Sequence, residues 1–280
     1  MILIADAGSS KTDWALIGDN ETQQVQTDGI NPYFTSEKKL TAFLEKNELL
    51  ASNKDSVDIL FFYGAGCSNQ SNIKKVNTVL KNFFPESDIF IYTDIFGAAR
   101  ALFQRESGIA CILGTGANCC RFDGKKIIQC SPSLGYILGD EGSGAYFGKE
   151  LLRTFLYGQL PAELSEEFNS RYQLKKDNIL EQVYHDKFPN TYLAGFTSFL
   201  NEMQEHPYIC KMIEKGIKKY FENHLLYLTE NQNEKVRFAG SVAWYFKEVI
   251  QDVGKKYNVK ADMFIQSPME KLIRFHQKES

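Results

Sequence analysis

The sequence lacks several features that would point directly to a function. None of its six cysteines forms a C-x-x-C pair, and its four histidines show no metal-site spacing with each other. No apolar run approaches the roughly 18–20 residues that a membrane helix needs. No long basic cluster is present in a chain whose formal net charge is -3. We therefore expect no membrane span, and neither nucleic acid nor an acidic membrane surface as a partner.

What is present is an ordinary globular composition. Hydrophobic residues make up 43% and charged residues 24% of the 280 residues, enough for one large domain or two smaller ones. The first residues, MILIADAGSSK, carry no basic leader and soon turn polar, so they predict a β-strand and not a signal peptide. With cysteines scattered in apolar surroundings, this favours a reducing cytoplasm.

The order of the predicted elements suggests two copies of one architecture. Strands at 2–6, 12–18 and 22–27, with a polar turn at Asp19–Asn20, form a β-meander. Helices from about residue 36 to 50, at 72–84 and at 96–104 alternate with strands at 57–64 and 88–94. A second meander begins near residue 109, with strands at 109–114, 118–124 and 125–131. The predicted fold class is α/β, with helices against mixed sheets.

The rest of the chain is expected to be mainly helical before a last pair of strands. Residues 144–230 read as helices, with Pro161, Pro189 and Pro207 as breaks. A strand at 235–241 leads into one helix at 242–257, for which Ser241 is a candidate N-cap. A strand at 261–267 and a helix at 268–277 complete the chain.

Two glycine turns carry the clearest chemical signal. DAGSSKT (6–12) and LGTGANC (113–119) each join two predicted antiparallel strands. Such turns can direct several backbone N–H groups at one spot, which suits a phosphate. Either turn alone is more simply a plain hairpin, and neither is a P-loop or a Rossmann fingerprint. Two of them, each opening a meander, favour a triphosphate held from both sides. Further donors would be the side chains of Ser9, Ser10, Lys11, Thr12 and Thr115.

Four carboxylates are candidates for chemistry. Asp94 ends a predicted strand, where ligands gather in open α/β sheets, so it can accept a proton from a substrate hydroxyl or simply cap the next helix. Asp6 directly precedes the first turn and can hold a phosphate-bound Mg²⁺ through water, or can merely shape the turn. Asp140 and Glu141 lie in GDEGSG (139–144), where exposed carboxylates suit sugar hydroxyls. An ordinary loop is the alternative there.

Two shorter stretches leave their roles open. Asn31 in GINPY precedes Pro32, which favours an extended backbone, and its amide either reaches a ligand or caps the turn. FAGSVA (238–243) places Gly240 and Ser241 at the end of a strand. Since neither side chain projects far, the pair can pack under a flat ring or can begin a helix.

In this order and spacing, DAGSSKTDW, TDIFGAARA, LGTGANC, LGDEGSGAYFG and FAGSVA resemble sugar kinases of the actin–hexokinase–heat-shock-chaperone ATPase superfamily. The resemblance spans residues 2 to about 273 and is strongest to N-acetylglucosamine kinases, in the group that also holds the benzoyl-CoA reductase activator ATPases. It implies two ribonuclease-H-like domains around a nucleotide cleft. One would be residues 1–110 completed by the C-terminal helix 268–280, and the other residues 111–267 with a helical insertion.

The resemblance also implies roles for the motifs. Asp94 would be the catalytic base for the sugar 6-hydroxyl, and Asn31, Asn118 and Asp140 would hold the amino sugar. The reaction would be ATP-dependent phosphorylation of an amino sugar, N-acetylglucosamine above others, with ATP and Mg²⁺ as cofactors and a homodimer as a plausible assembly. The nucleotide would contact two sets of residues, Gly8, Ser9, Ser10, Lys11, Thr12, Gly114, Thr115 and Gly116 at the phosphates and Gly240 and Ser241 at adenosine.

The sequence departs from the family pattern at two places. The first loop reads DAGSSKT where the family more often has DGGGTKT, and Ala7, Ser9 and Ser10 restrict the backbone more than glycine does. Lys271 stands where the family often has glycine, and nothing in the sequence explains this change.

Other functions stay open at this point. N-acetylmuramate, glucosamine and N-acetylmannosamine are further substrates to consider. An activator-type ATPase would need cysteine ligands for an iron–sulfur cluster, but adjacent residues of a strand, such as Cys119 and Cys120, point to opposite faces, so that one is expected in the core. A non-catalytic sugar sensor is a third hypothesis. Its DNA-binding form is not favoured, because the first loop begins at residue 6 and the charge is not basic.

Overall fold

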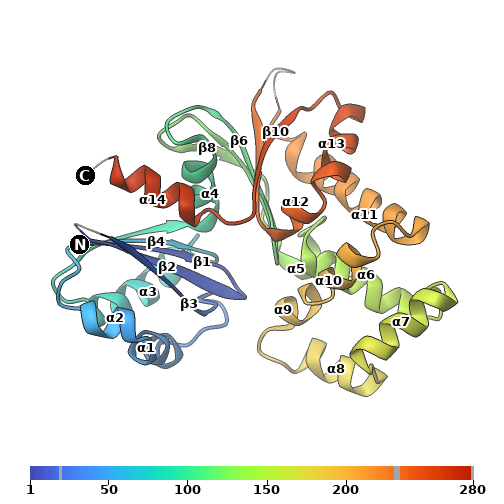
Figure 1. Cartoon of the computed structure of the whole chain (residues 1–280), viewed down its shortest axis with the longest axis horizontal. Helices are drawn as coiled ribbons and strands as arrows, with labels where there is room; N and C mark the ends of the chain where they lie inside the picture. Colours follow the sequence, from blue (N-terminus) through green and yellow to red (C-terminus); the bar gives the residue numbers. More distant parts are fainter. Residues whose placement is uncertain (19–20, 230–233, 279–280) are drawn as a thin grey trace. The chain divides into compact units, whose positions relative to one another are not determined.

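The structure is a computed structural model that describes residues 1–18, 21–229 and 234–278, so the turn expected at Asp19–Asn20 lies outside it. Within the described residues, strands β1 to β10 form two five-stranded sheets (Figure 1). The strand order is β3-β2-β1-β4-β5 in the first sheet and β10-β9-β6-β7-β8 in the second. Read from β8, the second order repeats the first. The predicted α/β fold with two copies of one sheet is confirmed.

The first sheet is a meander continued by two parallel strands. The strands β1 and β4 pair in parallel, as do β4 and β5, whereas β2 is antiparallel to both β1 and β3. The register pairs Ala7 with Gly64 and Gly64 with Thr93, so β1, β4 and β5 end together at one edge of the sheet. The bounds are β1 (Ile2–Ala7), β2 (Lys11–Ile17), β3 (Thr22–Asp28), β4 (Ile59–Gly64) and β5 (Asp88–Thr93).

Helices cover this sheet on both faces. Leu3 and Phe62 are buried on the face covered by α1 and α3, while α14 packs on α4 and on β1 and β2. One helix expected from about residue 36 to 50 is two, because Asn47 is extended and its Oδ1 caps α2 by accepting from the N–H of Leu50 at 3.2 Å. The bounds are α1 (Glu37–Lys46), α2 (Glu48–Asn53), α3 (Gln70–Phe83), α4 (Asp94–Phe103) and α14 (Met269–Gln277).

The second sheet has the same plan, and a long helical segment separates its strands β8 and β9. Pro161 is the N-cap of α7, while Pro189 and Pro207 lie in the first turns of α9 and α11, as the sequence predicted. The strands are β6 (Gly108–Leu113), β7 (Ala117–Phe122), β8 (Ile127–Cys130), β9 (Val236–Ala239) and β10 (Ala261–Ile265). The helices before β9 are α5 (Gly135–Leu138), α6 (Gly144–Leu156), α7 (Ala162–Tyr172), α8 (Lys176–Tyr184), α9 (Pro189–Ala194), α10 (Thr197–Glu202), α11 (Pro207–Tyr220) and the π-helix η1 (Phe221–Leu225).

The helix expected at 242–257 is also two helices, α12 (Ser241–Tyr245) and α13 (Lys247–Lys256). The break falls at Phe246, which leaves helical backbone geometry (φ -106°, ψ 26°) and buries its ring edge-on against Phe147 at 5.7 Å between centroids. The expectation that Ser241 is the N-cap is wrong. Gly240 takes that position, at a φ of 112° that residues with a β-carbon rarely adopt.

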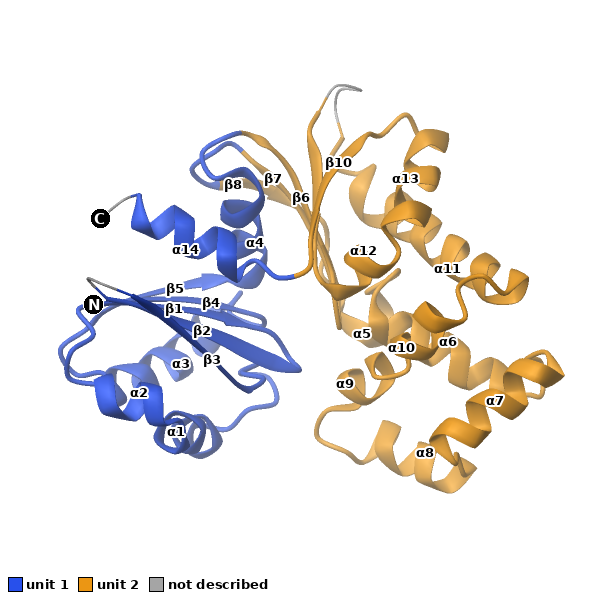
Figure 2. Ribbon diagram, viewed as in Figure 1, with its two compact units in different colours: residues 1–106, 123–126, 267–280 blue, residues 107–122, 127–266 orange. Residues whose placement is uncertain are grey.

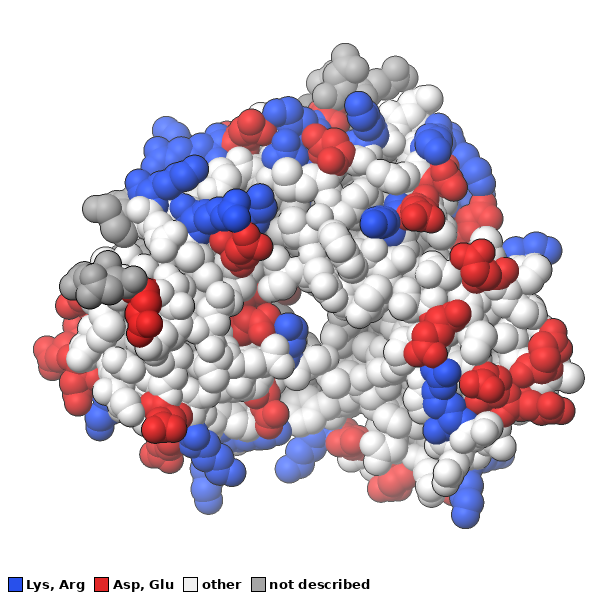
Figure 3. Space-filling model, in the orientation of Figure 1, with Lys and Arg blue, Asp and Glu red and all other residues white. Residues whose placement is uncertain are grey.

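The chain divides into two compact units (Figure 2). The first comprises residues 1–106, 123–126 and 267–280, and the second residues 107–122 and 127–266. Acidic and basic side chains are interspersed on the face that Figure 3 shows. In the parts of the chain that the structure describes, no helix is both long enough and apolar enough to span a bilayer.

Candidate active site

In the first unit, the turn between β1 and β2 is a tight hairpin. The N–H of Gly8 donates to the carbonyl of Lys11 at 2.9 Å. A β-carbon on Gly29 would lie 2.2 Å from the carbonyl oxygen of Ser9, so the chain after β3 passes directly against the turn. Thr12 is fully buried, and its hydroxyl accepts from the N–H of Ile30 at 3.2 Å. Thr12 therefore supports the turn from inside.

Asn31 fixes the same turn from the other side. Its Nδ2 donates to Ser9 Oγ at 2.9 Å, and its Oδ1 accepts from the N–H of Tyr33 at 3.1 Å. Gly66, at a φ of 78°, leaves room for this amide, because a β-carbon there would lie 2.5 Å from Asn31 Oδ1. Of the two roles that the sequence left open, these contacts support the turn-capping role of Asn31.

Asp94 lies at the edge where β1, β4 and β5 end. It is the first residue of α4, whose N-cap is Thr93, and its Oδ1 accepts from the N–H of Ile95 at 2.8 Å. The simple N-cap role is therefore wrong for Asp94. Burial, followed by the negative charge of Asp94, raises the pKa of the Cys67 thiol to about 12. The charge of Asp94 therefore affects neighbouring groups.

Asp6 lies at the same edge of the sheet, where the negative charge of Asp94 affects its pKa. Burial, followed by the negative charges of Asp13 and Asp94, raises the pKa of Asp6 to about 7, while Lys11 acts in the opposite direction. Lys11 itself pairs with Asp13, with 2.9 Å between Nζ and Oδ2. The first unit thus gathers three carboxylates and one ammonium group beside its hairpin.

In the second unit, the hairpin between β6 and β7 is hydrogen-bonded to the N-terminus of α6. The N–H of Gly114 donates to the carbonyl of Gly116 at 3.0 Å. The N–H groups of Gly144 and Ala145 donate to the carbonyls of Gly114 and Thr115 at 2.8 and 3.1 Å. A β-carbon on Gly114 would meet nothing within 4 Å, so the tip of this hairpin is open.

The acidic loop before α6 lies against this hairpin. Asp140 has a φ of 55°, and its Oδ1 accepts from the N–H of Ala117 at 3.3 Å. A β-carbon on Gly116 would lie 3.2 Å from Asp140 Oδ2, so the carboxylate packs closely against this glycine. The expectation that this carboxylate is exposed is wrong, because Asp140 is only 9% exposed. Burial raises its pKa, and the Ala117 N–H and the charge of His224 oppose that effect.

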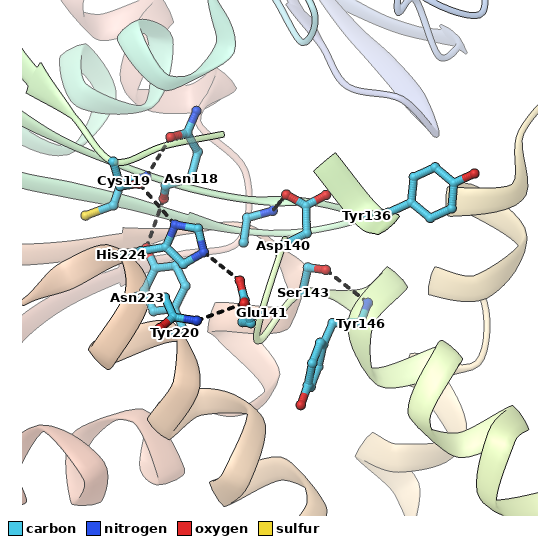
Figure 4. A network of polar contacts seen from close by, with 12 residues as sticks. Asn118, Cys119, Tyr136, Asp140, Glu141, Ser143, Tyr146, Tyr220, Asn223 and His224 are labelled. Atoms are coloured by element: carbon cyan, nitrogen blue, oxygen red, sulfur yellow. Dashed lines mark hydrogen bonds and ion pairs between the residues drawn. The ribbon is translucent and has the colours of Figure 1, made fainter. Parts of the chain in front are cut away.

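Glu141 is held by two side chains from η1 (Figure 4). Its Oε1 accepts from Asn223 Nδ2 at 2.8 Å, and its Oε2 lies 3.1 Å from His224 Nε2. Burial acts to raise the pKa of Glu141, but the hydrogen bonds that it accepts from its own backbone, His224 and Asn223 leave the pKa below its ordinary value. Sequence reasoning missed Asn223 and His224, since both lie inside a helical run that carries no motif.

Asn118 is the second residue of β7, directly after the hairpin. Its Oδ1 accepts from the N–H of Cys119 at 2.8 Å, and its backbone carbonyl accepts from the Tyr220 hydroxyl at 2.9 Å. Cys119 and Cys120 are both fully buried, where the sequence predicted one of them in the core. Among the described residues, no group of three or more His, Cys, Asp and Glu is arranged to hold a metal ion.

Gly240 also belongs to this part of the second unit. A β-carbon there would lie 2.3 Å from the carbonyl oxygen of Leu113 and 3.2 Å from the nitrogen of Gly114. Ser241 follows it and is exposed. The turn from β9 to α12 is therefore packed against the start of the second hairpin, and the three motifs LGTGANC, GDEGSG and FAGS meet in one unit.

Two sheets of the same strand order, each with a glycine hairpin between its first two strands in sequence, define the class of protein. It is a sugar kinase with the actin-like fold. A structure from Thermus thermophilus, a hexokinase of the ROK family, matches 100% of this chain and 99% of its own at 12% identity and a TM-score of 0.58. At this identity the likeness shows the fold alone. A glucokinase of the same family from Streptomyces griseus, in complex with glucose and AMPPNP, covers 99% of this chain and 98% of its own, also at 12% identity and a TM-score of 0.58.

A nearer relative defines the family. A protein proposed to be an N-acetylglucosamine kinase, from Porphyromonas gingivalis, is 38% identical over 99% of both chains, with a TM-score of 0.92. This chain belongs to the same family of sugar kinases as the P. gingivalis protein. Its enzyme class is that of an ATP-dependent sugar kinase. A second such protein, from Chromobacterium violaceum, covers 98% of both chains at 14% identity and a TM-score of 0.73, which again shows the fold alone. No protein-family model and no curated protein matches the sequence.

Proposed function

We propose that this kinase transfers the γ-phosphoryl group of ATP to the 6-hydroxyl of an N-acetylated amino sugar, N-acetylglucosamine above others. The observation that carries the proposal is the position of Asp94, at the carboxyl edge of β1, β4 and β5 and beside the first glycine hairpin. The 38% identical relative from P. gingivalis, itself a proposed N-acetylglucosamine kinase, supports the choice of sugar. The narrower placement near the benzoyl-CoA reductase activators is part of this proposal.

Asp94 acts as the base in the proposed reaction. The sugar O6 forms a bond to the γ-phosphorus, the bond from that phosphorus to the bridging oxygen breaks, ADP leaves, and the hydroxyl proton passes to the Asp94 carboxylate. One Asp94 oxygen is already held by the N–H of Ile95 at 2.8 Å. This bond helps to fix the orientation of the carboxylate that accepts the proton.

Asp6 fits the role of a magnesium contact through water. Burial and the charges of Asp13 and Asp94 disfavour the ionised form of Asp6, as its raised pKa of about 7 reflects. A divalent cation favours the ionised carboxylate and would reverse that effect. A bound Mg²⁺ would supply charge neutralisation to the phosphates.

Each hairpin is a phosphate-binding element in this proposal. Gly8, Ser9, Ser10 and Lys11 of the first hairpin are expected to contact phosphate, with Thr12 shaping that turn, and so are Gly114, Thr115 and Gly116 of the second hairpin. Gly240 and Ser241 are assigned to adenosine, and Asn118, Asp140 and Glu141 to the amino sugar. Asn31 is assigned to the sugar as well, in addition to the turn-capping contacts that its amide makes. A cytoplasmic location and a homodimeric assembly remain predictions of the same proposal.

The test is an ATP-dependent phosphorylation assay on a panel of N-acetylglucosamine, N-acetylmannosamine, N-acetylmuramate, glucosamine and glucose. We expect the highest kcat/KM with N-acetylglucosamine and phosphate on its O6, checked by NMR of the product. Asp94→Asn is expected to lower kcat by a factor of at least about 10², with the sugar dissociation constant nearly unchanged.

Asp88→Asn is the matched control for Asp94→Asn. Asp88 is exposed at the opposite end of the same strand, β5, and should keep wild-type turnover. Full activity of Asp94→Asn would overturn the assignment of the base. Turnover of ATP that no sugar stimulates would instead overturn the kinase reaction.

A further inference from the structure

One turn of the helical segment α11–η1 contacts two segments of the second unit that carry candidate sugar-binding residues, the strand β7 and the acidic loop before α6. Tyr220 ends α11, and His224 lies one turn later in η1. Their rings stack with 5.2 Å between centroids and 25° between planes. The Tyr220 hydroxyl donates to the carbonyl of Asn118, and His224 contacts the carboxylate of Glu141 (Figure 4). The two side chains therefore fix the hairpin strand and the acidic loop from a common support.

The partners of His224 determine which of its ring nitrogens donates a hydrogen bond and which accepts one. His224 is 3% exposed, and both ring nitrogens have partners: Nε2 lies 3.1 Å from Glu141 Oε2, and Nδ1 lies 3.1 Å from Ser131 Oγ. An ionised carboxylate only accepts, so Nε2 carries the hydrogen. With a neutral ring, Nδ1 then accepts from the Ser131 hydroxyl. Ser131 is itself anchored, because its N–H donates to the carbonyl of Cys119 at 2.9 Å.

The arrangement leaves Glu141 able to accept further hydrogen bonds. Its side-chain partners are Asn223 on Oε1 and His224 on Oε2, and the carboxylate has further lone-pair capacity. The side chain keeps 19% of its surface exposed, so a ligand can reach it. Nearby, Asn118 uses its Oδ1 within the protein. A fixed carboxylate with lone pairs to spare suits the hydroxyls of a sugar ring.

Close packing against α11 restricts the conformation of the acidic loop. Gly142 has a φ of 75°, and a β-carbon there would lie 3.0 Å from Tyr220 Cβ and 3.3 Å from the carbonyl oxygen of Gly216. The loop that carries Asp140 and Glu141 thus lies directly on α11. A π-helix is rare and is often found at functional sites, and here η1 begins directly after Tyr220.

We propose that His224, supported by Ser131 and stacked on Tyr220, is a positioning residue that orients the Glu141 carboxylate to accept hydrogen bonds from sugar hydroxyls. This inference rests on the proposed function, because it requires a sugar at Glu141. It assigns His224 to recognition of the sugar and not to ATP binding or to the transfer of the proton. The specificity of the enzyme among hexosamines then depends on a residue that need not touch the substrate.

The experiment compares His224→Leu, His224→Gln and Ser131→Ala by steady-state kinetics with each substrate varied in turn. We expect His224→Leu to raise the KM for the amino sugar about tenfold, the loss of one hydrogen bond to a charged group, while the KM for ATP stays within about twofold of wild type. His224→Gln keeps a donor for Glu141 and should recover most of the affinity. Ser131→Ala should produce a smaller rise in the same parameter.

A coupling measurement separates positioning from a general loss of structure. If His224 acts through Glu141, the effects of His224→Leu and Glu141→Gln on the sugar KM should not add in the double variant. His185→Leu is the control, since His185 is exposed on the surface and should leave all parameters unchanged. An unchanged sugar KM in His224→Leu, an equal rise in both KM values, or full additivity would overturn the proposal.

The same measurements distinguish failure of this inference from failure of the proposed function. If wild type phosphorylates an amino sugar but the variants do not differ from it, only the inference fails. If wild type phosphorylates no sugar of the panel, the proposed function fails, and sugar binding by calorimetry to wild type and Ser131→Ala then decides the inference. The Ser131→Ala variant also serves if His224→Leu does not fold, because it removes one hydroxyl and leaves the imidazole in place.

Discussion

The Asp140 carboxylate accepts a hydrogen bond from the backbone N–H of Ala117 at 3.3 Å, and this bond ties the acidic loop to the second glycine hairpin. Asp140 is almost fully buried, and it holds a left-handed backbone conformation that costs a non-glycine residue free energy. The position is one where a charged group is kept despite burial and backbone strain, as is common at functional sites.

Asp140→Ala and Asp140→Asn should separate the two roles of this side chain. The alanine variant leaves the Ala117 N–H without its partner and should lower the free energy of unfolding by about 1–3 kcal/mol. The asparagine variant keeps an acceptor and should be less destabilised, yet it should raise the sugar KM because the charge is lost. Urea denaturation and steady-state kinetics measure the two effects. Equal stability of both variants would contradict the role of the hydrogen bond.

Gly142→Ala should be more damaging than a positive φ alone explains. Gly142 and Gly135 have similar φ values, 75° and 71°, but a β-carbon at Gly135 meets nothing within 4 Å, whereas one at Gly142 lies 3.0 Å from Tyr220 Cβ. Gly135→Ala should therefore cost only the backbone term, about 1–2 kcal/mol, and Gly142→Ala more. Thermal and urea unfolding compare the pair, and we expect only Gly142→Ala to raise the sugar KM. The reverse order of stabilities would refute the close packing of this loop.

Gly240→Ala makes a parallel test at the proposed adenosine site. Its β-carbon would lie 2.3 Å from the carbonyl oxygen of Leu113, so β9 or the second hairpin must shift. Gly158 also has a positive φ, 65°, with nothing within 4 Å, and Gly158→Ala supplies the control. We expect Gly240→Ala to be the less stable variant and to raise the KM for ATP. An unchanged KM for ATP would argue against adenosine at this turn.

His276 makes the first unit sensitive to acid. Burial, followed by the charge of Arg100, lowers the pKa of His276 from its ordinary value of 6.5 to about 4. The folded state thus keeps the imidazole neutral, stacked on Phe61 and 2.9 Å from the Tyr63 hydroxyl, while the unfolded chain takes up a proton below pH 6.5. The contribution is complete above pH 6.5 and is lost as the pH falls towards 4, by at most about 3 kcal/mol.

His276→Gln should remove that pH dependence. The variant should be less stable than wild type at pH 7.5, and the difference should shrink between pH 6.5 and 4. Chemical unfolding at a series of pH values measures it. His185→Gln, at an exposed histidine, is expected to leave the wild-type profile unchanged. A constant difference between His276→Gln and wild type across this range would contradict the assignment to His276.

The glycine turns and the strand endings could be read from local sequence. The α/β class and the position of Asp94 directly after β5 follow from runs of apolar residues bounded by Gly, Asp and Asn, because these patterns act over a few residues. The helix breaks at Asn47 and Phe246 could not be read in this way. At Phe246 the gain from burying the ring against Phe147 outweighs the helical preference of the surrounding residues.

The burial of the acidic loop also required the tertiary structure. The motif GDEGSG suggests exposed carboxylates, since nothing nearby in the sequence offers partners for them. The partners come from far along the chain, Ala117 for Asp140 and His224 for Glu141.

The sequence by itself determined the strands, the two hairpins and the candidate carboxylates, because hydrophobic periodicity and turn chemistry are local properties. Only the tertiary structure decided which groups meet. The register of β1, β4 and β5 brings Asp6 and Asp94 to one edge, and the packing of α11 and η1 brings Tyr220 and His224 to the acidic loop. Such contacts join residues tens of positions apart, and their geometry depends on the packing of whole elements.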